Sequence, residues 1–526
     1  MATTMTTAPI IERKLVSSRK NWYTSGPAIV LYIAAAKLLL HLLTASRYGY
    51  FRDELYFLDC GEHLDFGYVD QPPMIAVVAW FGRHVLGGSL LGIRFLPALA
   101  GAAVVWLTGV ITREIGGGRF AQGLGAFVVG FAPLYLSLGH LMTMNSFDPL
   151  IWMGCAYFVL RIIQTSHQRY WIWFGALAGL GLENKYAIAV FGAGIVIGVL
   201  LTEQRRALAH KWIWIGGGLA FLIFLPNLIW NIQHHWPFIE LMHNIRASGR
   251  DIELGPLEFL KRQVLMMGPL AAPLWLGGVA YLLFSPTAKR FRPLAWAFIV
   301  TITLFWVLKG KDYYPGPVYP MMLAAGAVAL ERLAAGKAWR WIKPAYVVSL
   351  GAGAVALLPV VVPVLPVDTY LRYQAKLPFA IPRSEHSHMR DALPQHYADE
   401  FGWQEMTLAV ARAYQSLPAE ERPSVAIFAN NFGEAGAIDF FGAQYELPKA
   451  IGGHQNYFLW GPRQYTGDPM IVLGDSVEGL RRWCTEVKVA AELDNPYNGM
   501  EHDPVLICRG FKPNLQVAWP KLKDWD

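Results

Sequence analysis

The sequence predicts a polytopic α-helical membrane protein that ends in a water-soluble α/β domain. Two observations indicate this fold class. First, 54% of the 526 residues are hydrophobic and only 16% are charged, whereas soluble globular proteins carry about 25% charged residues. Second, apolar runs fill residues 27–363, and residues 368–526 have the composition of a soluble domain. We therefore expect an N-terminal segment over 1–26, a transmembrane domain over 27–364 and a soluble domain over 365–526.

Eleven apolar runs are candidates for spanning helices, because a helix that crosses a bilayer needs roughly 20 apolar residues. They are 27–43, 91–112, 120–138, 149–163, 170–182, 187–201, 212–229, 269–284, 293–308, 318–330 and 345–364. Several of them are short. Residues 170–201 are interrupted by Glu183-Asn184-Lys185, and one span of that length is too long, so we divide it into two.

The cations lie mainly in the loops between these runs. With eleven spans, six basic groups fall on one side of the membrane: Arg13, Lys14, Arg19 and Lys20; Arg113 and Arg119; Arg161 and Arg169; Arg205, Arg206 and Lys211; Lys289, Arg290 and Arg292; and Arg332, Lys337, Arg340 and Lys343. The positive-inside rule makes this side cytoplasmic. The N-terminus is then cytoplasmic, and the soluble domain is periplasmic or extracellular. Topology signals thus account for the formal charge of +7, and we expect no nucleic-acid partner.

The soluble domain contains the apolar runs SVAIFA, MIVLG and PVLIC, which alternate with helical patterns such as 406–415. This alternation predicts a small α/β domain. Two further segments, ANNFGEAGAIDFFG and GGHQNYFLWGP, are rich in Gly, Asn and aromatic residues, which suits either carbohydrate contacts or ordinary turns. Cys484 and Cys508 could form a disulfide if this domain faces an oxidising compartment. The basic start followed by the run 27–43 favours a retained first span over a cleavable signal peptide.

Carboxylates gather in the first outer loop, residues 46–90. Asp53, Glu54 and Asp70 lie there among Tyr, Phe and Leu residues, which is more acidic than a plain connection requires. The following run, 75–86, is apolar on one side and predicts a helix in the membrane interface. Further along, Asn145 and Asp148 precede an apolar run. Asp148 before Pro149 is typical of a helix N-cap, which does not exclude a functional role.

Cations and aromatic residues gather in two later outer loops. The segment KGKDYYPGPVYP contains Lys309 and Lys311, and the loop 230–263 contains His243 and Arg246. Such cations can snorkel at the interface or bind anionic membrane lipids. Lys185 is either a charged hairpin tip or a functional group at membrane depth. For His243 a hydrogen-bonded interfacial ring is favoured over metal ligation, because the spacing matches no metal motif well.

Four motifs together resemble family 39 glycosyltransferases. They are FRDELYF after the first run, YVDQPP shortly after it, NSFDPL before a later run, and KGKDYYPGPVYP. This family includes bacterial relatives of protein O-mannosyltransferases, lipid A aminoarabinose transferases and rhizobial galacturonosyltransferases. The resemblance covers about residues 1–364. It implies a GT-C-type fold in a bacterial inner membrane, a sugar donor linked to polyprenyl phosphate and an active site outside the cytoplasm.

The resemblance also assigns residues. Asp53 matches the family's acidic residue in the first outer loop, and Glu54 completes the acidic pair of the mannosyltransferase branch. Asp70 and Asp148 match further acidic positions, and Lys309 or Lys311 matches a late basic one. The aminoarabinose branch has Glu-Lys-Pro-Pro where this chain has Asp-Gln-Pro-Pro, so that branch's phosphate-contacting lysine is missing. The same branch has a zinc-binding histidine near the place of His243, which leaves a divalent metal open without assigning one.

These residues suit sugar transfer to a hydroxyl group. An acceptor hydroxyl needs a base during attack, and Asp53, with Glu54 beside it, is the candidate; a single base with direct attack inverts the anomeric carbon. Asp70, Asp148 and Asn145 would orient acceptor or sugar. Cations would neutralise the leaving phosphate, the candidates being Lys309, Lys311, Arg246 and Lys185. The acceptor can be an envelope glycan, lipid or protein.

Two other functions are compatible with the composition. A transporter or flippase of polyprenyl-linked sugars would place charge at the bilayer midplane between repeated halves, whereas here charge gathers on one face without a clear repeat. A non-catalytic glycan- or lipid-binding membrane protein would keep the scaffold without the activity.

Overall fold

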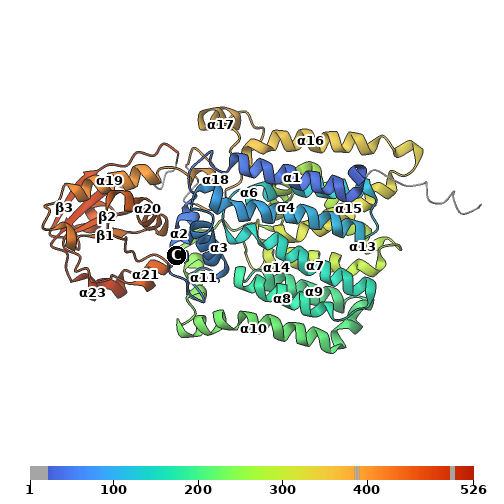
Figure 1. Cartoon of the computed structure of the whole chain (residues 1–526), viewed down its shortest axis with the longest axis horizontal. Coiled ribbons are helices and arrows are strands. Elements are labelled where there is room, and N and C mark those ends of the chain that lie inside the picture. Colours follow the sequence, from blue (N-terminus) through green and yellow to red (C-terminus); the bar gives the residue numbers. More distant parts are fainter. Residues whose placement is uncertain (1–21, 384, 387–388, 390, 498–503) are drawn as a thin grey trace, which may run out of the picture.

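The computed structural model describes residues 22–383, 385–386, 389, 391–497 and 504–526. Most of the predicted cytoplasmic N-terminus therefore lies outside the described residues. Figure 1 shows a bundle of long helices with a smaller domain, which contains a β-sheet, at one end of it. Short helices lie crosswise between the two parts.

Each of the eleven predicted runs coincides with helix. The bundle consists of α1 (Gly26–Thr44), α4 (Leu90–Glu114), α5 (Arg119–Phe131), α6 (Pro133–Leu138), α7 (Asp148–Thr165), α8 (Tyr170–Asn184), α9 (Ile188–Leu200), α10 (Lys211–Gln233), α13 (Ala272–Phe284), α14 (Arg292–Val307), α15 (Tyr319–Leu333) and α16 (Ile342–Val361). The run 120–138 is divided into α5 and α6 at Pro133, which lacks a backbone N–H donor. Among the described residues, six helices are long and apolar enough to cross a membrane, or up to eight if each of two bent pairs is one span.

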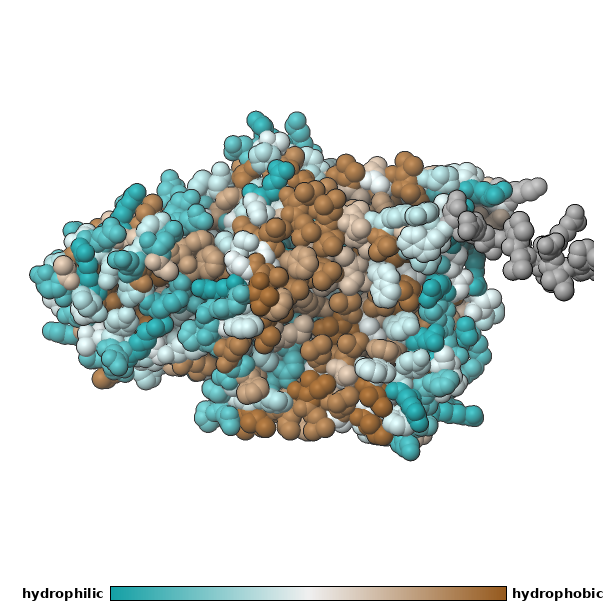
Figure 2. All heavy atoms as spheres, in the orientation of Figure 1, coloured by the Kyte–Doolittle hydropathy of each residue, from teal (hydrophilic) through white to brown (hydrophobic). Residues whose placement is uncertain are grey.

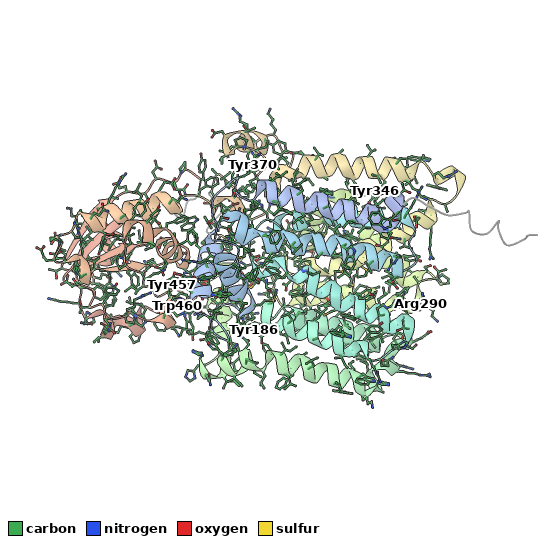
Figure 3. All side chains as sticks on the ribbon, viewed as in Figure 1. Tyr186, Arg290, Tyr346, Tyr370, Tyr457 and Trp460 are labelled. Carbon is green, nitrogen blue, oxygen red and sulfur yellow. A yellow bond between two sulfur atoms is a disulfide. The ribbon has the colours of Figure 1, made fainter. Side chains whose placement is uncertain are left out.

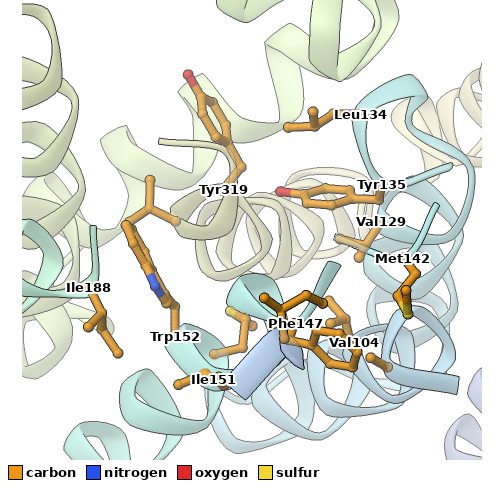
Figure 4. Packing of buried hydrophobic residues seen from close by; sticks show 14 of the residues in the cluster. Val104, Val129, Leu134, Tyr135, Met142, Phe147, Ile151, Trp152, Ile188 and Tyr319 are labelled. Atoms are coloured by element: carbon orange, nitrogen blue, oxygen red, sulfur yellow. The ribbon is translucent and has the colours of Figure 1, made fainter. Parts of the chain in front are cut away.

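Glycines allow two pairs of helices to approach closely. A Cβ atom on Gly175 of α8 would collide with the backbone of Gly216 on α10, and one on Gly326 of α15 would collide with the backbone of Leu274 on α13. Small residues at such crossings are typical of helix packing in membranes. Between the helices the core is closely packed. Figure 4 shows Trp152, Tyr135 and Tyr319 within it, and Trp152 stacks on Phe191 with ring centroids 4.9 Å apart.

The loops that carry most of the predicted cytoplasmic cations lie together at one end of the bundle. The Glu331 carboxylate accepts hydrogen bonds from the backbone N–H groups of Gly118 and Ala121, and Lys289 forms an ion pair with Glu203. Figure 3 places Arg290 at this end, far from Tyr457. Figure 2 shows an apolar band across the visible face of the bundle, between this hydrophilic end and the hydrophilic C-terminal part, as expected for an integral membrane protein.

The other end of the bundle carries the short crosswise helices. They are α2 (Arg52–Glu62), α3 (Met74–His84), α11 (Pro237–Ser248), α12 (Pro256–Met267), α17 (Val367–Gln374) and α18 (Gln395–Ala398). The predicted interfacial helix 75–86 is α3. The break at Lys185 between α8 and α9 confirms that residues 170–201 form two helices.

The C-terminal part contains a mixed four-stranded sheet of order β1-β2-β4-β3. Strands β1 (Ala426–Ala429), β2 (Met470–Leu473) and β4 (Val505–Arg509) are the three predicted apolar runs, and β1 and β2 are parallel. The sequence analysis missed β3 (Glu486–Ala491), whose residues are mostly exposed. A disulfide joins Cys484 to Cys508 of β4. The remaining longer helices are α19 (Trp403–Gln415), α20 (Phe432–Phe441) and α21 (Asn456–Trp460).

Candidate active site

A cavity of about 560 Å³ lies where the helix bundle meets the C-terminal part. One wall is apolar and is formed by α5, α6, residues 265–271 and α16. The polar residues of the lining include Arg52, Asp53, Asn145, Lys311, Asp312, Arg383, Glu385, Gln395 and His396. The cavity can therefore hold a molecule with an apolar chain and a charged head.

Asp53, a predicted site residue, lines this cavity. It lies in the first turn of α2, and its side chain is 30% exposed. The Asp53 Oδ1 atom is 3.4 Å from Nε of Arg52. A partly exposed carboxylate at a cavity wall can reach a bound hydroxyl group, which is the first requirement for a base.

Glu54 does not line the described cavity, and its predicted catalytic role stays a prediction. Its side chain is fully buried and pairs with Arg94 of α4 through both oxygens, at 2.9 and 2.8 Å. The same carboxylate accepts hydrogen bonds from the backbone N–H groups of Phe51 and Met142. These contacts anchor α2 to the bundle. Asp53 and Glu54 have different surroundings because adjacent residues of a helix face different directions.

Glu400 of the C-terminal part is the second carboxylate on Arg94, at 3.1 Å. Burial raises the pKa of Glu400 to about 8, although the Arg94 guanidinium opposes this shift. Burial therefore favours the protonated form of Glu400. With Glu400 protonated, the buried group contains one cation and one anion, which avoids an uncompensated charge.

Of the four predicted phosphate-binding cations, Lys311 is the one that lines the cavity among the described residues. Its Nζ atom is 2.6 Å from Glu385 and 3.4 Å from Asp251. Burial would raise the pKa of Glu385, but the charges of Lys311 and Arg52 outweigh it and lower that pKa to about 2. Glu385 therefore stays ionised, and an incoming phosphate has to share Lys311 with it.

The other three cations lie outside the cavity wall. Lys309 is exposed and pairs with Glu253 at 2.7 Å, and Arg246 is exposed on α11. The Lys185 Nζ atom donates to Asn145 Oδ1 at 2.6 Å and lies 3.8 Å from the ring centre of Tyr314. Asn145 does line the cavity, so Lys185 contacts a residue of the cavity wall without lining the cavity itself.

Asp148 is buried at the start of α7 and lies outside the described cavity wall. Asp148 is the expected N-cap of this helix, but the N-cap residue is Phe147. The Asp148 Oδ1 atom instead accepts a hydrogen bond from Asn184 at 2.8 Å. This bond ties α7 to the end of α8. Asp148 therefore stabilises the fold beside the site. Asn145, three residues earlier in the sequence, lines the cavity.

Asp70 is half-buried and accepts a hydrogen bond from the Tyr56 hydroxyl at 2.9 Å. Burial raises the pKa of Asp70 to about 7, although the Tyr56 hydroxyl opposes this shift. The negative charge of Asp53 adds to it, and the positive charge of Arg250 opposes it. Asp70 is therefore close enough to Asp53 to influence its charge, although it is not part of the described cavity wall.

The raised pKa of Asp70 predicts a pH-dependent stability. An unfolded-state Asp ionises near pH 3.9, so between about pH 4 and 7 the folded chain binds more protons here and stability falls as pH rises. We expect Asp70→Asn to remove this loss. We expect the Tm of Asp70→Asn minus the Tm of wild type, both measured in detergent, to be larger at pH 8 than at pH 5. The same difference at both pH values would contradict a raised pKa of Asp70.

His243 lies exposed on α11. No group of three or more His, Cys, Asp or Glu side chains that could hold a metal ion occurs among the described residues. The donor set around His243 thus does not fit a metal site, and no step of the chemistry below uses a metal.

The sequence analysis missed the contribution of the C-terminal part to the site. Residues Phe379, Ile381, Pro382, Arg383, Glu385, Pro394, Gln395 and His396 all line the cavity. The two Gly- and Asn-rich segments are docking surfaces rather than turns: Gly436 packs against the backbone of α2, and Asn456 accepts a hydrogen bond from the Val69 N–H at 2.7 Å. Tyr457 donates its hydroxyl to Asp59 of α2, and Figure 3 shows it at this junction.

Comparison with known proteins gives both sequence and structural relatives. Residues 70–230 match the family model described as dolichyl-phosphate-mannose-protein mannosyltransferase. The chain is 25% identical over 296 residues to lipid A galacturonosyltransferase RgtD of Rhizobium johnstonii, an alignment that spans 53% of this chain and 59% of that protein.

Among solved structures, ArnT from Cupriavidus metallidurans is similar over nearly its whole length. In its apo state the TM-score is 0.60 at 16% sequence identity, covering 91% of this chain and 97% of that chain. Bound to undecaprenyl phosphate, the same protein gives a TM-score of 0.59. The chain therefore has a helical fold like that of ArnT, and its predicted resemblance to GT-C-type glycosyltransferases is confirmed at the level of the fold.

Proposed function

We propose that this protein transfers a sugar from a polyprenyl-phosphate donor to a hydroxyl group of an envelope acceptor, with Asp53 as the general base. The observation that carries the proposal is the cavity, whose lining combines a long apolar surface with Asp53 and Lys311. A lipid chain would lie against α5, α6 and α16, and its phosphate would point toward Lys311. The relatives support this choice, since one is named a lipid A galacturonosyltransferase and one was solved with undecaprenyl phosphate.

The chemistry is a single displacement. The acceptor oxygen forms a bond to the anomeric carbon while the bond from that carbon to the phosphate oxygen breaks, and Asp53 takes the hydroxyl proton. The phosphate leaves as an anion, which Lys311 stabilises. Direct attack inverts the configuration at the anomeric carbon. Asn145, held by Lys185, is placed in the cavity wall to orient the sugar or the acceptor.

The same proposal includes an orientation. We place the N-terminus in the cytoplasm and the site on the extracytoplasmic face of a bacterial inner membrane, with eleven spans and a soluble domain from residue 365 onward. The clustering of basic loops at the end opposite the site supports this orientation. The Cys484–Cys508 disulfide supports it too, because disulfides persist in oxidising compartments.

The direct test uses purified protein in liposomes with radiolabelled polyprenyl-phosphate sugars and lipid, glycan or peptide acceptors. We expect labelled product without any ion gradient. Movement of the donor across the bilayer without product would contradict the proposal and favour a transporter. Binding without either movement or product would favour a non-catalytic protein.

Lys311 and Lys309 form a matched pair for testing the phosphate contact. We expect Lys311→Met to raise the donor KM by about tenfold or more, because a charge-assisted contact to phosphate is lost. Lys309→Met should change the donor KM less than about twofold, because Lys309 is a surface ion-pair partner. Steady-state kinetics with varied donor measure both.

A second variant separates the phosphate contact from simple neutralisation of Glu385. If Lys311 only balances that carboxylate, then the double variant with Lys311→Met and Glu385→Gln should recover the wild-type KM. We expect the double variant to remain impaired for the donor while its thermal stability recovers.

A further inference from the structure

The first turn of α2 is held from the C-terminal part by Asp399. The Arg52 backbone N–H donates to the Asp399 carbonyl oxygen at 3.0 Å, which satisfies a group that has no partner within the helix. The indole N–H of Trp403 donates to the same carbonyl oxygen at 2.9 Å. Asp399 is thus fixed to both α2 and α19, although it is more than 300 residues from α2 in the sequence.

The Arg52 side chain lies between two carboxylates. Its Nε atom is 3.4 Å from Asp53 Oδ1 and 3.8 Å from Asp399 Oδ2. Arg52 is largely buried and Asp399 wholly so, whereas Asp53 faces the cavity. Phe432 covers the guanidinium at 5.3 Å, and Gly433 leaves room for the Arg52 side chain. Arg52 is therefore confined on several sides.

A third carboxylate, Glu385, lies close enough for the Arg52 charge to act on it, since Arg52 together with Lys311 lowers the pKa of Glu385. Asp399 differs from the other carboxylates because it contacts Arg52 twice, through its buried side chain and through its backbone carbonyl oxygen. Asp399 therefore holds Arg52 in place, so that the Asp53 side chain can face the cavity.

We infer that Asp399 is a positioning residue, which orients the Asp53 carboxylate through Arg52. The inference rests on the proposed function, in which Asp53 is the base of sugar transfer. It makes the C-terminal part a component of the active site.

The test compares Asp399→Asn and Asp399→Glu with a control, Glu421→Gln, which removes an ion pair to Arg509 elsewhere in the C-terminal part. For Asp399→Asn we expect kcat to fall about tenfold through lost alignment, with the donor KM unchanged. Asp399→Glu should restore part of the rate, and Glu421→Gln should resemble wild type.

A second measurement does not depend on turnover. Infrared difference spectra between each protein and its Asp53→Asn counterpart isolate the carboxylate stretching bands of Asp53. These bands should shift in Asp399→Asn relative to wild type, because the contact of Asp53 with Arg52 changes, and they should not shift in Glu421→Gln. Wild-type kcat and wild-type bands in Asp399→Asn would overturn the inference, even if less folded protein were recovered. If wild type transfers no sugar, the proposed function fails, and the infrared bands alone decide the role of Asp399.

Discussion

Replacing Asp53 by Asn is expected to lower the rate of sugar transfer by about 10³-fold, because a general base contributes about 10²–10⁴-fold. The amide has nearly the same shape but cannot accept the acceptor proton. Binding of polyprenyl phosphate should persist, since the apolar wall and Lys311 are unchanged. Initial rates with radiolabelled donor, together with lipid binding by native mass spectrometry, measure the two effects separately.

A matched control for this variant is Asp368→Asn, which changes an exposed carboxylate in the first turn of α17, outside the described cavity wall. It should retain a rate within about twofold of wild type. Equal activity of Asp53→Asn and wild type would remove Asp53 from the mechanism. A loss of lipid binding in Asp53→Asn would instead show that the residue acts before the chemical step.

Replacing Arg94 by Met should destabilise the protein by about 3–5 kcal/mol, the usual cost of leaving a buried carboxylate without its partner. Arg94 is 2% exposed and pairs with Glu54 and Glu400. It also donates to the backbone carbonyls of Ala45 and Gly49. We expect a large drop in Tm in detergent and a loss of monodisperse protein in size-exclusion chromatography.

The carboxylates around Arg94 provide an internal comparison. Glu54→Gln should cost less stability than Arg94→Met, because Glu400, whose pKa is about 8 in the intact group, can then ionise and balance Arg94. Equal destabilisation by the two variants would show that Glu400 cannot take over the charge. A wild-type Tm for Arg94→Met would contradict the anchoring role of this group.

The sequence predicted the helices and the position of Asp53, because both depend on local patterns. Apolar runs become helices wherever a bilayer or a core surrounds them, and an acidic motif beside aromatic residues marks a polar site. The sequence could not separate Asp53 from Glu54, or Lys311 from Lys309. Members of each pair are close in sequence, and only the packed structure decides which one is buried, exposed or turned to the cavity.

The sequence also left out the C-terminal wall of the site. Glu385, His396 and Asp399 carry no motif that distinguishes them from surface residues of a soluble domain. Their roles arise from contacts with Lys311, with the carbonyl of Val360 and with Arg52. Each of these contacts joins segments that are far apart in the chain or that belong to different elements, which a pattern of neighbours does not reveal.

The Arg94 contact with Glu400 spans 306 residues of the chain. At a synthesis rate of about 5–20 residues per second, this separation takes roughly 15–60 s to translate. During that interval a newly made chain already has Asp53, but the apolar wall is still being made, since α5, α6 and α16 all follow Arg94 in the sequence. The segment that fixes the first turn of α2 comes last. A chain that ends before Asp399 therefore lacks both carboxylate contacts, those of Asp399 and Glu400, and we expect it to transfer no sugar.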